Sequence, residues 1–251
     1  MYLIAGPCSI EGEGFIAIAK ACKEAGATHI RGGVFKPRSS PFRWRGLGEE
    51  ALPFVVEMKA QVGLPFVAEA MSPKQIEILY PYVDMFQCGT RNATNTELLK
   101  EFGRQDKPVI YKRGMAQTIE EFVMGADFIL NEGNKNVILC ERGIRSFDPF
   151  MRNVFDVGCV AAVKQICALP IIADPSHGTG KASLVSPVAR AAIAAGADGL
   201  IVEVHDDPAK AMTDGEQSIT PRSFGSLVGG VERVWWAVHG RRSRGSEVSR
   251  T

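Results

Sequence analysis

Four side chains of the kinds that bind divalent metal ions stand at the ends of short apolar runs or close behind them. They are Cys8, His177, Glu203 and Asp214. Asp214 lies in "MTDGEQSI", eleven positions after Glu203, in a loop long enough to fold back over the preceding run. Thiolate, imidazole and carboxylate groups together bind Zn²⁺, Fe²⁺, Mn²⁺ or Co²⁺, and a mixed set leaves the identity of the metal open. His205 is the alternative ligand, or a partner that orients one.

Each of these residues also has an ordinary structural explanation. A lone cysteine after a strand is usually a small buried hydrophobe, and His177 in "DPSHGTG" would equally cap a turn. The prediction of one metal site therefore depends on the four residues occurring together at one end of the fold.

Lysines and arginines also follow apolar runs, in a chain whose net charge is only +1. They are Arg31, Lys36, Arg38, Arg91, Lys112, Arg142 and Arg145. Arginine binds phosphate and carboxylate through two parallel hydrogen bonds, and lysine adds a compact charge. One phosphate does not need so many cations, so the pattern predicts two anionic groups or two phosphorylated substrates. In the loop "GGVFKPRSSPFRWRGLG", Arg43 and Arg45 remain open between phosphate contacts and solvent-exposed charges.

The totals bound the class of protein. The chain has 251 residues, of which 45% are hydrophobic and 23% charged, as in an ordinary globular protein. A pI near 7.6 argues against a general nucleic-acid binder, and no apolar run approaches the roughly 20 residues of a membrane span. "MYLIAGPC" is too short for a signal peptide, and six scattered cysteines without a CxxC pair fit reduced thiols. We expect a cytoplasmic protein with small-molecule partners, and no nucleic acid or membrane.

Eight short apolar runs, each followed by an amphipathic stretch, must position these side chains. The runs are "YLIA", "THIRGG", "PFVAEA", "MFQCG", "PVIYKRG", "NVILCERG", "LPIIADPSHG" and "GLIVEVH". Helices are predicted over 15–26, closed by Gly26, and over 49–62, from Ser72, from about Asn95 and from Thr118, and over 154–166, 185–195 and 224–239. Thr118 and Glu121 have the spacing of a capping box.

The runs are continuously hydrophobic, which is typical of parallel strands buried on both faces. Eight such units in 251 residues predict an α/β protein, a (β/α)8 TIM barrel formed by a single domain over residues 1–240. An open doubly wound sheet is the alternative, but no GxGxxG motif follows a strand. Residues 241–251 are predicted to be a flexible tail. In a TIM barrel the active site lies at the carboxyl ends of the strands, where all the side chains named above occur.

The segments that carry these residues also resemble a known family. "AGPCSIE", "RGGVFKPRSSPFRWRGLG", "QCGTRNATN", "VIYKRG", "LCERGIRSF", "DPSHGTG" and "DGLIVEVH" with "TDGEQSI" are similar to 3-deoxy-D-arabino-heptulosonate-7-phosphate (DAHP) synthases of the Iβ type. The match runs in order from about residue 3 to 224. It implies a metal-dependent transferase, a 3-deoxy-7-phosphoheptulonate synthase. Such an enzyme condenses phosphoenolpyruvate with erythrose 4-phosphate, the first step of the shikimate pathway to chorismate and the aromatic amino acids.

The resemblance assigns roles to individual residues. It implies one divalent metal ion per subunit on Cys8, His177, Glu203 and Asp214. It implies phosphoenolpyruvate binding by Arg31, Lys36, Arg91, Lys112 and Arg142, with Glu69 nearby. Arg145 is expected to bind substrate from its place in the pattern of cations. Lys36, Pro37, Arg38 and Ser39 match the erythrose 4-phosphate signature. The catalytic residues are expected to be Lys36, Glu69, Lys112 and His177, and the proton donor to be Glu69, Lys112 or a water on the metal.

Three alternatives and two further expectations accompany this assignment. A metal-dependent aldolase on a similar barrel would share histidine and glutamate ligands but should not need so many cations. The sibling octulosonate synthases, which use arabinose 5-phosphate, carry a different loop where this chain has Pro37-Arg38. A non-catalytic phosphate-binding barrel is the alternative of another class. The chain begins almost directly at its first strand, so we expect an enzyme without feedback inhibition by tyrosine or phenylalanine. A homodimer or homotetramer is implied by the family.

Overall fold

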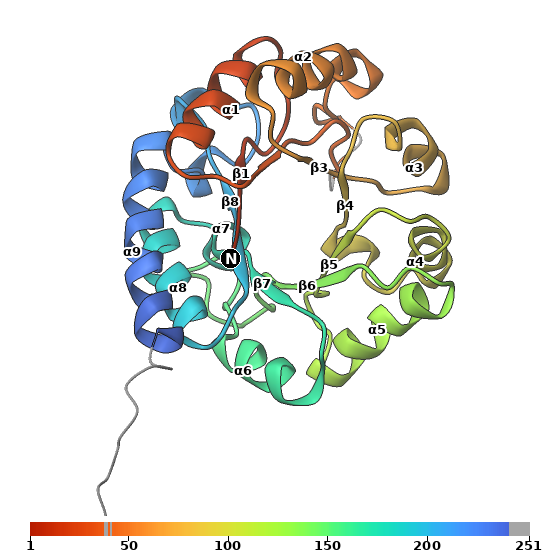
Figure 1. Ribbon diagram of the computed structural model, residues 1–251, viewed down its shortest axis with the longest axis vertical. Helices are drawn as coiled ribbons and strands as arrows, with labels where there is room; N and C mark the ends of the chain where they lie inside the picture. The colour runs from red at the N-terminus through yellow and green to blue at the C-terminus, as the bar shows by residue number, and fades with distance from the viewer. Residues whose placement is uncertain (38–39, 41, 241–251) are drawn as a thin grey trace, which may run out of the picture.

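Eight parallel strands close into a barrel in a computed structural model of the chain, which describes residues 1–37, 40 and 42–240. The strands follow one another around the barrel in sequence order, and β1 closes it by pairing with β8 (Figure 1). They are β1 (Tyr2–Gly6), β2 (His29–Arg31), β3 (Phe66–Glu69), β4 (Met85–Cys88), β5 (Val109–Lys112), β6 (Val137–Glu141), β7 (Ile171–Ala173) and β8 (Gly199–Glu203). The predicted (β/α)8 barrel is confirmed, and the open-sheet alternative is wrong. The predicted tail, 241–251, lies outside the described residues.

Helices surround the barrel and lie outside the ring of strands (Figure 1). They are α1 (Gly14–Glu24), α2 (Leu52–Val62), α3 (Pro73–Leu79), α4 (Thr96–Gly103), α5 (Ile119–Asn131), α6 (Val157–Ile166), α7 (Pro175–Thr179), α8 (Ala182–Ala194) and α9 (Pro221–His239). Four 3₁₀ turns are η1 (Gly48–Ala51), η2 (Thr90–Asn92), η3 (Pro208–Lys210) and η4 (Gly215–Gln217). Over the described part of the chain, each helix is too short or too polar to cross a bilayer.

Helix ends follow local capping more closely than apolar spacing. Thr118 and Glu121 form the predicted capping box at the start of α5. Helix α6 starts at Val157 rather than at 154, because the Asp156 side chain accepts a hydrogen bond from the backbone N–H of Cys159. Val154 instead forms an isolated bridge with Ile144. The short helix α7 was not predicted, and it carries one of the proposed metal ligands.

The apolar core has two parts, one inside the barrel and one outside it. Alternate residues of each strand point inward, where they fill the barrel. This inner cluster consists of Ile4, Val67, Met85, Ile110, Ile138, Cys140, Ile172 and Ile201. The larger outer cluster lies between the strands and the helices, and it includes at least one sequence neighbour of each inner residue. The barrel is therefore a packed core with no pore.

Candidate active site

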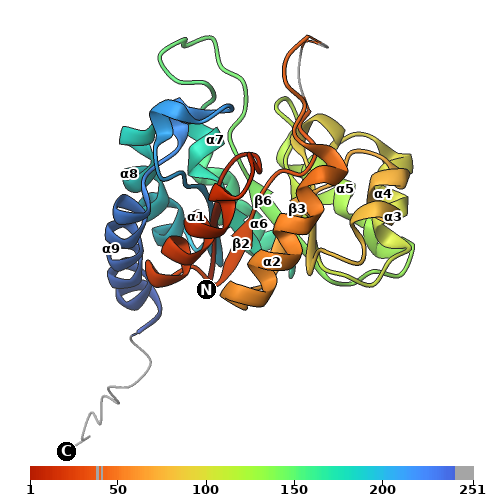
Figure 2. The same cartoon turned by 90° about the horizontal axis from the view of Figure 1, so that it is seen from above.

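The inner core residues determine which polar side chains reach the barrel mouth. In a strand, residues two apart lie on the same face. Two positions beyond Val67, Met85, Ile110, Cys140, Ile172 and Ile201 stand Glu69, Gln87, Lys112, Arg142, Asp174 and Glu203. The inward-facing layer thus changes from apolar to polar, and mostly charged, at the carboxyl end of the barrel. This end lies opposite the N-terminus (Figure 2). One end of the fold carries the reactive groups.

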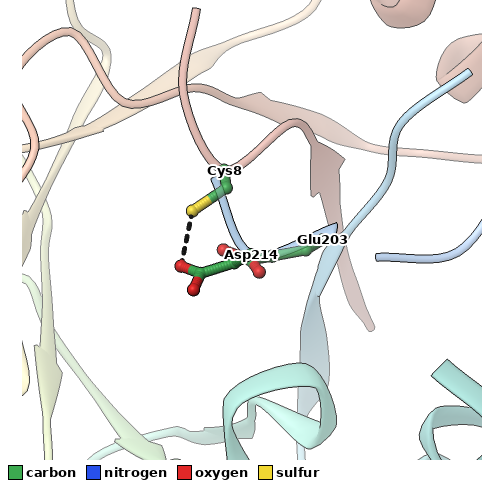
Figure 3. A group of neighbouring side chains, drawn as sticks. All are labelled: Cys8, Glu203 and Asp214. Atoms are coloured by element: carbon green, nitrogen blue, oxygen red, sulfur yellow. Dashed lines mark hydrogen bonds between the residues drawn. The ribbon is translucent and has the colours of Figure 1, made fainter. Parts of the chain in front are cut away.

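Three of the predicted metal ligands lie together at this end. The sulfur of Cys8 and carboxylate oxygens of Glu203 and Asp214 all lie within 4.8 Å of one another (Figure 3). The Cys8 thiol donates a hydrogen bond to Oδ2 of Asp214 at 2.9 Å. Glu203 accepts a hydrogen bond from Nε2 of Gln217 at 2.7 Å. These contacts place one soft and two hard donor groups around a common point.

His177 lies beside this cluster, on α7. It is not among the residues whose ligand atoms lie within 4.8 Å of one another, but its Nε2 is 3.5 Å from Oε1 of Glu203. Its Nδ1 lies 2.8 Å from Oδ2 of Asp174, whose other oxygen accepts the backbone N–H of His177. Burial lowers the pKa of His177 more than the two neighbouring carboxylates raise it. The imidazole is therefore neutral at pH 7, with Nδ1–H on Asp174 and Nε2 free to bind a metal.

The Cys8 thiol is protonated in the metal-free protein. Burial is the main reason that its pKa rises to about 12, and Glu203 and Asp214 raise it further. Nζ of Lys36 lies 2.8 Å from the sulfur and opposes the increase. Since only a thiolate binds a metal strongly, loading of the site has to displace this proton.

A cavity of about 330 Å³ opens above the cluster. Its described lining includes seven lysines and arginines against two carboxylates. Of the predicted site residues it contains Arg31, Lys36, Pro37, Glu69, Arg91, Lys112, Arg142, His177 and Asp214. Arg43, whose role the sequence left open, also reaches this cavity, whereas Arg45 does not line it. The predicted residues Arg38 and Ser39 lie outside the described residues.

The cations of the cavity fall into two groups. Arg31 donates to Glu203 at 2.8 Å, and Nζ of Lys112 lies 2.5 Å from Oδ2 of Asp174, in pairs that are almost fully buried. Among the described residues, Arg91 and Arg142 have no carboxylate at ion-pair distance. Burial lowers the pKa of Arg142, whose guanidinium donates to the carbonyl oxygen of Gly143 at 3.3 Å. The described residues provide no carboxylate that balances these two cations, so the cations favour a bound anion.

Arg113, next to Lys112, has a structural role instead. It directly follows β5 and is not part of the cavity lining; its Nη1 donates to Glu141 at 2.9 Å and to Asp156 at 3.0 Å. Its Nε and Nη2 donate to the backbone oxygen of Gln117. Arg113 and Glu141 are both buried, and they tie β5 and β6 to the start of α6. The register of the strand separates the two adjacent cations.

Glu69 extends from the end of β3 into the cavity and packs closely against Gly89. Nε2 of Gln87 donates to its carboxylate at 3.3 Å. A Cβ atom on Gly89 would lie 1.8 Å from Oε1 of Glu69, so the carboxylate occupies the space that the missing side chain leaves. Glu69 is the one carboxylate of the cavity without an arginine or lysine partner among the described residues.

Two predicted residues lie elsewhere. Arg145 is exposed and lines a neighbouring groove between α4 and α5 rather than this cavity, because the backbone turns at Gly143, whose φ is 91°. His205, the alternative ligand, contacts Glu11, with 3.6 Å between Nε2 and Oε2.

Three contributing residues were not assigned from the sequence. Asp174 holds His177 and Lys112, Gln217 holds Glu203, and Arg152 donates to Asp214 at 3.3 Å and to Gln217 at 2.9 Å. The two-residue register from Ile172 would have identified Asp174. Gln217 and Arg152 come from irregular loops, where no periodic signal exists.

Comparison with known proteins places this site in a family. The sequence profile of the DAHP synthetase I family matches residues 1–235. Phospho-2-dehydro-3-deoxyheptonate aldolase of Thermotoga maritima is 46% identical over 227 residues, which cover 90% of this chain and 67% of that protein. A 2-dehydro-3-deoxyphosphooctonate aldolase of Geobacter sulfurreducens is 32% identical, over 87% of this chain and 86% of its own length.

Solved structures agree. The crystal structure of the Thermotoga maritima aldolase, a DAHP synthase, superposes with a TM-score of 0.90 at 44% identity, over 94% of this chain and 70% of that one. A truncated form of 3-deoxy-D-arabino-heptulosonate 7-phosphate synthase from the same organism gives a TM-score of 0.87 at 41% identity, over 94% and 87% of the two chains. The matches span nearly the whole barrel, including every strand that carries a site residue. The chain belongs to the DAHP synthetase I family.

Proposed function

We propose that this chain is a metal-dependent synthase that condenses phosphoenolpyruvate with erythrose 4-phosphate to give 3-deoxy-D-arabino-heptulosonate 7-phosphate and phosphate. One observation carries the proposal: cations without carboxylate partners line a cavity directly beside a set of metal-binding side chains. Family membership and a 46% identical relative named for this product support the same reaction. The reaction is the first step of the shikimate pathway.

The donor set fits a transition metal better than Mg²⁺ or Ca²⁺, because it combines a thiolate and an imidazole with carboxylates. Cys8, His177, Glu203 and Asp214 would hold the ion. When bound, it supplies Lewis-acid polarisation of the aldehyde oxygen of the sugar phosphate. Asp174 keeps His177 in the tautomer that presents Nε2.

The cations bind and orient phosphoenolpyruvate. Arg91 and Arg142 hold the anionic groups that compensate them, and Lys112, already paired with Asp174, adds its remaining donors. Held in place, C3 of phosphoenolpyruvate attacks the aldehyde carbon, which converts an encounter of two substrates into an oriented step. Water then adds at C2, and the C2–O bond breaks to release phosphate. Arg142 and Lys112 stabilise the negative charge on the departing phosphate.

Glu69 is placed to exchange a proton with the reacting groups. It reaches the cavity, and among the described residues no cation forms an ion pair with it. Lys112 is the second candidate for this role, because it lines the same cavity. A carboxylate near the reacting carbon can accept the proton that the attacking water loses as its oxygen bonds to C2.

Choice of the sugar belongs to the loop after β2. Lys36 and Pro37 line the cavity, and Pro37 fixes its own φ and so restricts the path of the chain that follows. The identity to the octulosonate aldolase is 32%, against 46% to the heptonate aldolase. Pro37 and the higher identity to the heptonate aldolase favour erythrose 4-phosphate over arabinose 5-phosphate, the sugar of the alternative reaction.

Phosphate release from phosphoenolpyruvate tests the proposal. Purified protein is assayed with either sugar phosphate, with chelator, and after Mn²⁺, Fe²⁺, Zn²⁺ or Co²⁺ is restored. We expect metal-dependent release with erythrose 4-phosphate that C8A abolishes and that the matched variant C22A, in the buried face of α1, retains. Metal-independent turnover by C8A contradicts the ligand set. Failure of every metal to restore release favours a barrel that only binds phosphates.

We also propose a homo-oligomer, a homodimer or homotetramer, that works in the cytoplasm. Light scattering coupled to size-exclusion chromatography measures the mass of the particle in solution. A particle of about twice or four times the 27.2 kDa chain supports the proposal, and a particle of one chain contradicts it.

A further inference from the structure

Two of the proposed metal ligands come from loops rather than from strands, although the strands before these loops, β1 and β8, are paired. Cys8 lies in the segment that follows β1, and Asp214 lies 206 residues later in the long loop between β8 and α9. Glu203, by contrast, is fixed by the sheet, at the end of a strand paired along its whole length. The distance between the Cys8 sulfur and the Asp214 carboxylate therefore depends on how the two loops are held together.

Hydrogen bonds outside the ligand set join these loops. Oγ of Ser9 and Oγ1 of Thr213 lie 2.6 Å apart, and both residues are buried. Oγ of Ser9 also donates to Oε1 of Glu11 at 3.4 Å. The same oxygen of Glu11 accepts the backbone N–H of Met212 at 2.9 Å. Either hydroxyl can donate in the Ser9–Thr213 pair, and together with Glu11 this pair connects the two loops.

Asp214 needs such support because of its backbone. Its φ is 52°, and it is the one non-glycine residue with positive φ in the part of the chain that the structure describes. Residues other than glycine keep this left-handed conformation only where their surroundings fix it. Thr213 and Met212, the two residues before Asp214, are the ones held by Ser9 and Glu11. The strained residue is thus anchored from the segment that carries the thiol.

His205 steadies Glu11 from the other side. Its Nε2 lies 3.6 Å from Oε2 of Glu11, and its Nδ1 accepts the backbone N–H of Asp207. The carboxylate of Glu11 thus has a neighbour at each oxygen. His205 contributes to the arrangement of the loop rather than to the ligand set.

We propose that Ser9, Glu11 and Thr213 are positioning residues that hold Asp214 at binding distance from Cys8 and so set the metal affinity of the site. This inference rests on the metal site proposed above. Partners of metal ligands typically change affinity 10- to 100-fold when they are removed, although they never touch the ion. We call these three residues the loop clamp.

The test is a Co²⁺ titration of protein stripped by chelator, followed by the thiolate-to-cobalt absorption and calibrated with a competing chelator. T213V keeps the shape of the side chain and removes its hydroxyl, and S9A removes the other partner. We expect each to raise the dissociation constant for Co²⁺ about 10- to 100-fold, and T213S to restore the wild-type value. T28V is the matched control, because Thr28 bonds to the backbone of Leu3 at the opposite end of the barrel.

Melting of the metal-free proteins separates positioning from folding. T28V is expected to lower the melting temperature and leave the Co²⁺ dissociation constant unchanged, whereas S9A and T213V change the constant in protein that remains folded. Wild-type affinity in both S9A and T213V overturns the clamp and leaves the metal site intact. No thiolate absorption in wild-type protein overturns the metal site itself, and the clamp with it.

Discussion

Variants of Arg113 and Arg142 test whether the side to which a strand-end arginine points decides between a structural role and substrate binding. Both are buried arginines one position from a strand end, but Arg113 faces the helices and Arg142 faces the cavity. Replacing Arg113 by methionine leaves Glu141, which is fully buried, without its cation, and leaves the oxygen of Gln117 without two donors. Removing one partner of a buried ion pair costs about 3–5 kcal/mol. For a chain of this length that corresponds to a fall in melting temperature of about 6–20 °C.

Replacing Arg142 by methionine is expected to change substrate affinity more than thermal stability. The guanidinium has a carbonyl partner and no carboxylate among the described residues, so a buried charge disappears and no buried anion is left behind. We expect the melting temperature to change by less than about 2 °C. Loss of charge-assisted bonds worth about 1.5–3 kcal/mol weakens phosphoenolpyruvate binding by about 10- to 150-fold.

Differential scanning calorimetry gives the melting temperatures, and isothermal titration gives the affinity for phosphoenolpyruvate. R113M is expected to be destabilised and, at a temperature where it is folded, to bind phosphoenolpyruvate within about threefold of wild type. The reasoning is refuted if R142M loses as much stability as R113M, because Arg142 then has a structural partner. Unchanged affinity in R142M removes this residue from the substrate site.

Three further outcomes follow from the site. Because the Cys8 pKa is about 12 and the pKa of His177 is lowered, metal loading at pH 7 releases about one proton, from the thiol. Calorimetric enthalpies in buffers of different ionisation heat measure that number, and metal affinity should rise about tenfold per pH unit. G89A displaces Glu69 and should abolish turnover, whereas G14A, with open space around its Cβ, should not. D174N leaves the charge of Lys112 unpaired, so both thermal stability and metal affinity, by about 10- to 100-fold, should fall.

The fold was predictable because its signal repeats. Eight apolar runs of similar length, each followed by an amphipathic stretch, leave few architectures other than a closed barrel. Boundaries were less predictable where apolar residues continue beyond a helix. Val154 extends the spacing of α6 backward, but Asp156 caps the helix and fixes its start. The five-residue helix α7 has no periodicity to detect, and only Asp174 before Pro175 marks it.

Strand register explains which site residues a sequence identifies. Lys112 and Arg113 are equally cationic, but only Lys112 is an even number of residues from Ile110 in the barrel core. The same rule separates Arg142 from Glu141. Residues that come from loops obey no such rule: Gln217, Arg152 and the loop clamp reach the site through turns whose path depends on tertiary contacts.

The cations of the site form two sets, those with a carboxylate partner and those without one. Arg31 pairs with Glu203, and Lys112 pairs with Asp174. The charge of these two cations stabilises one carboxylate that is proposed to bind the metal and another that contacts His177. Arg91 and Arg142 also line the cavity, but they have no such partners among the described residues. A phosphate gains most from uncompensated cations, because it replaces water around them without breaking an ion pair. We therefore expect phosphate groups to bind at Arg91 and Arg142, and the carbon atoms that react to lie between them and the Cys8–Glu203–Asp214 cluster.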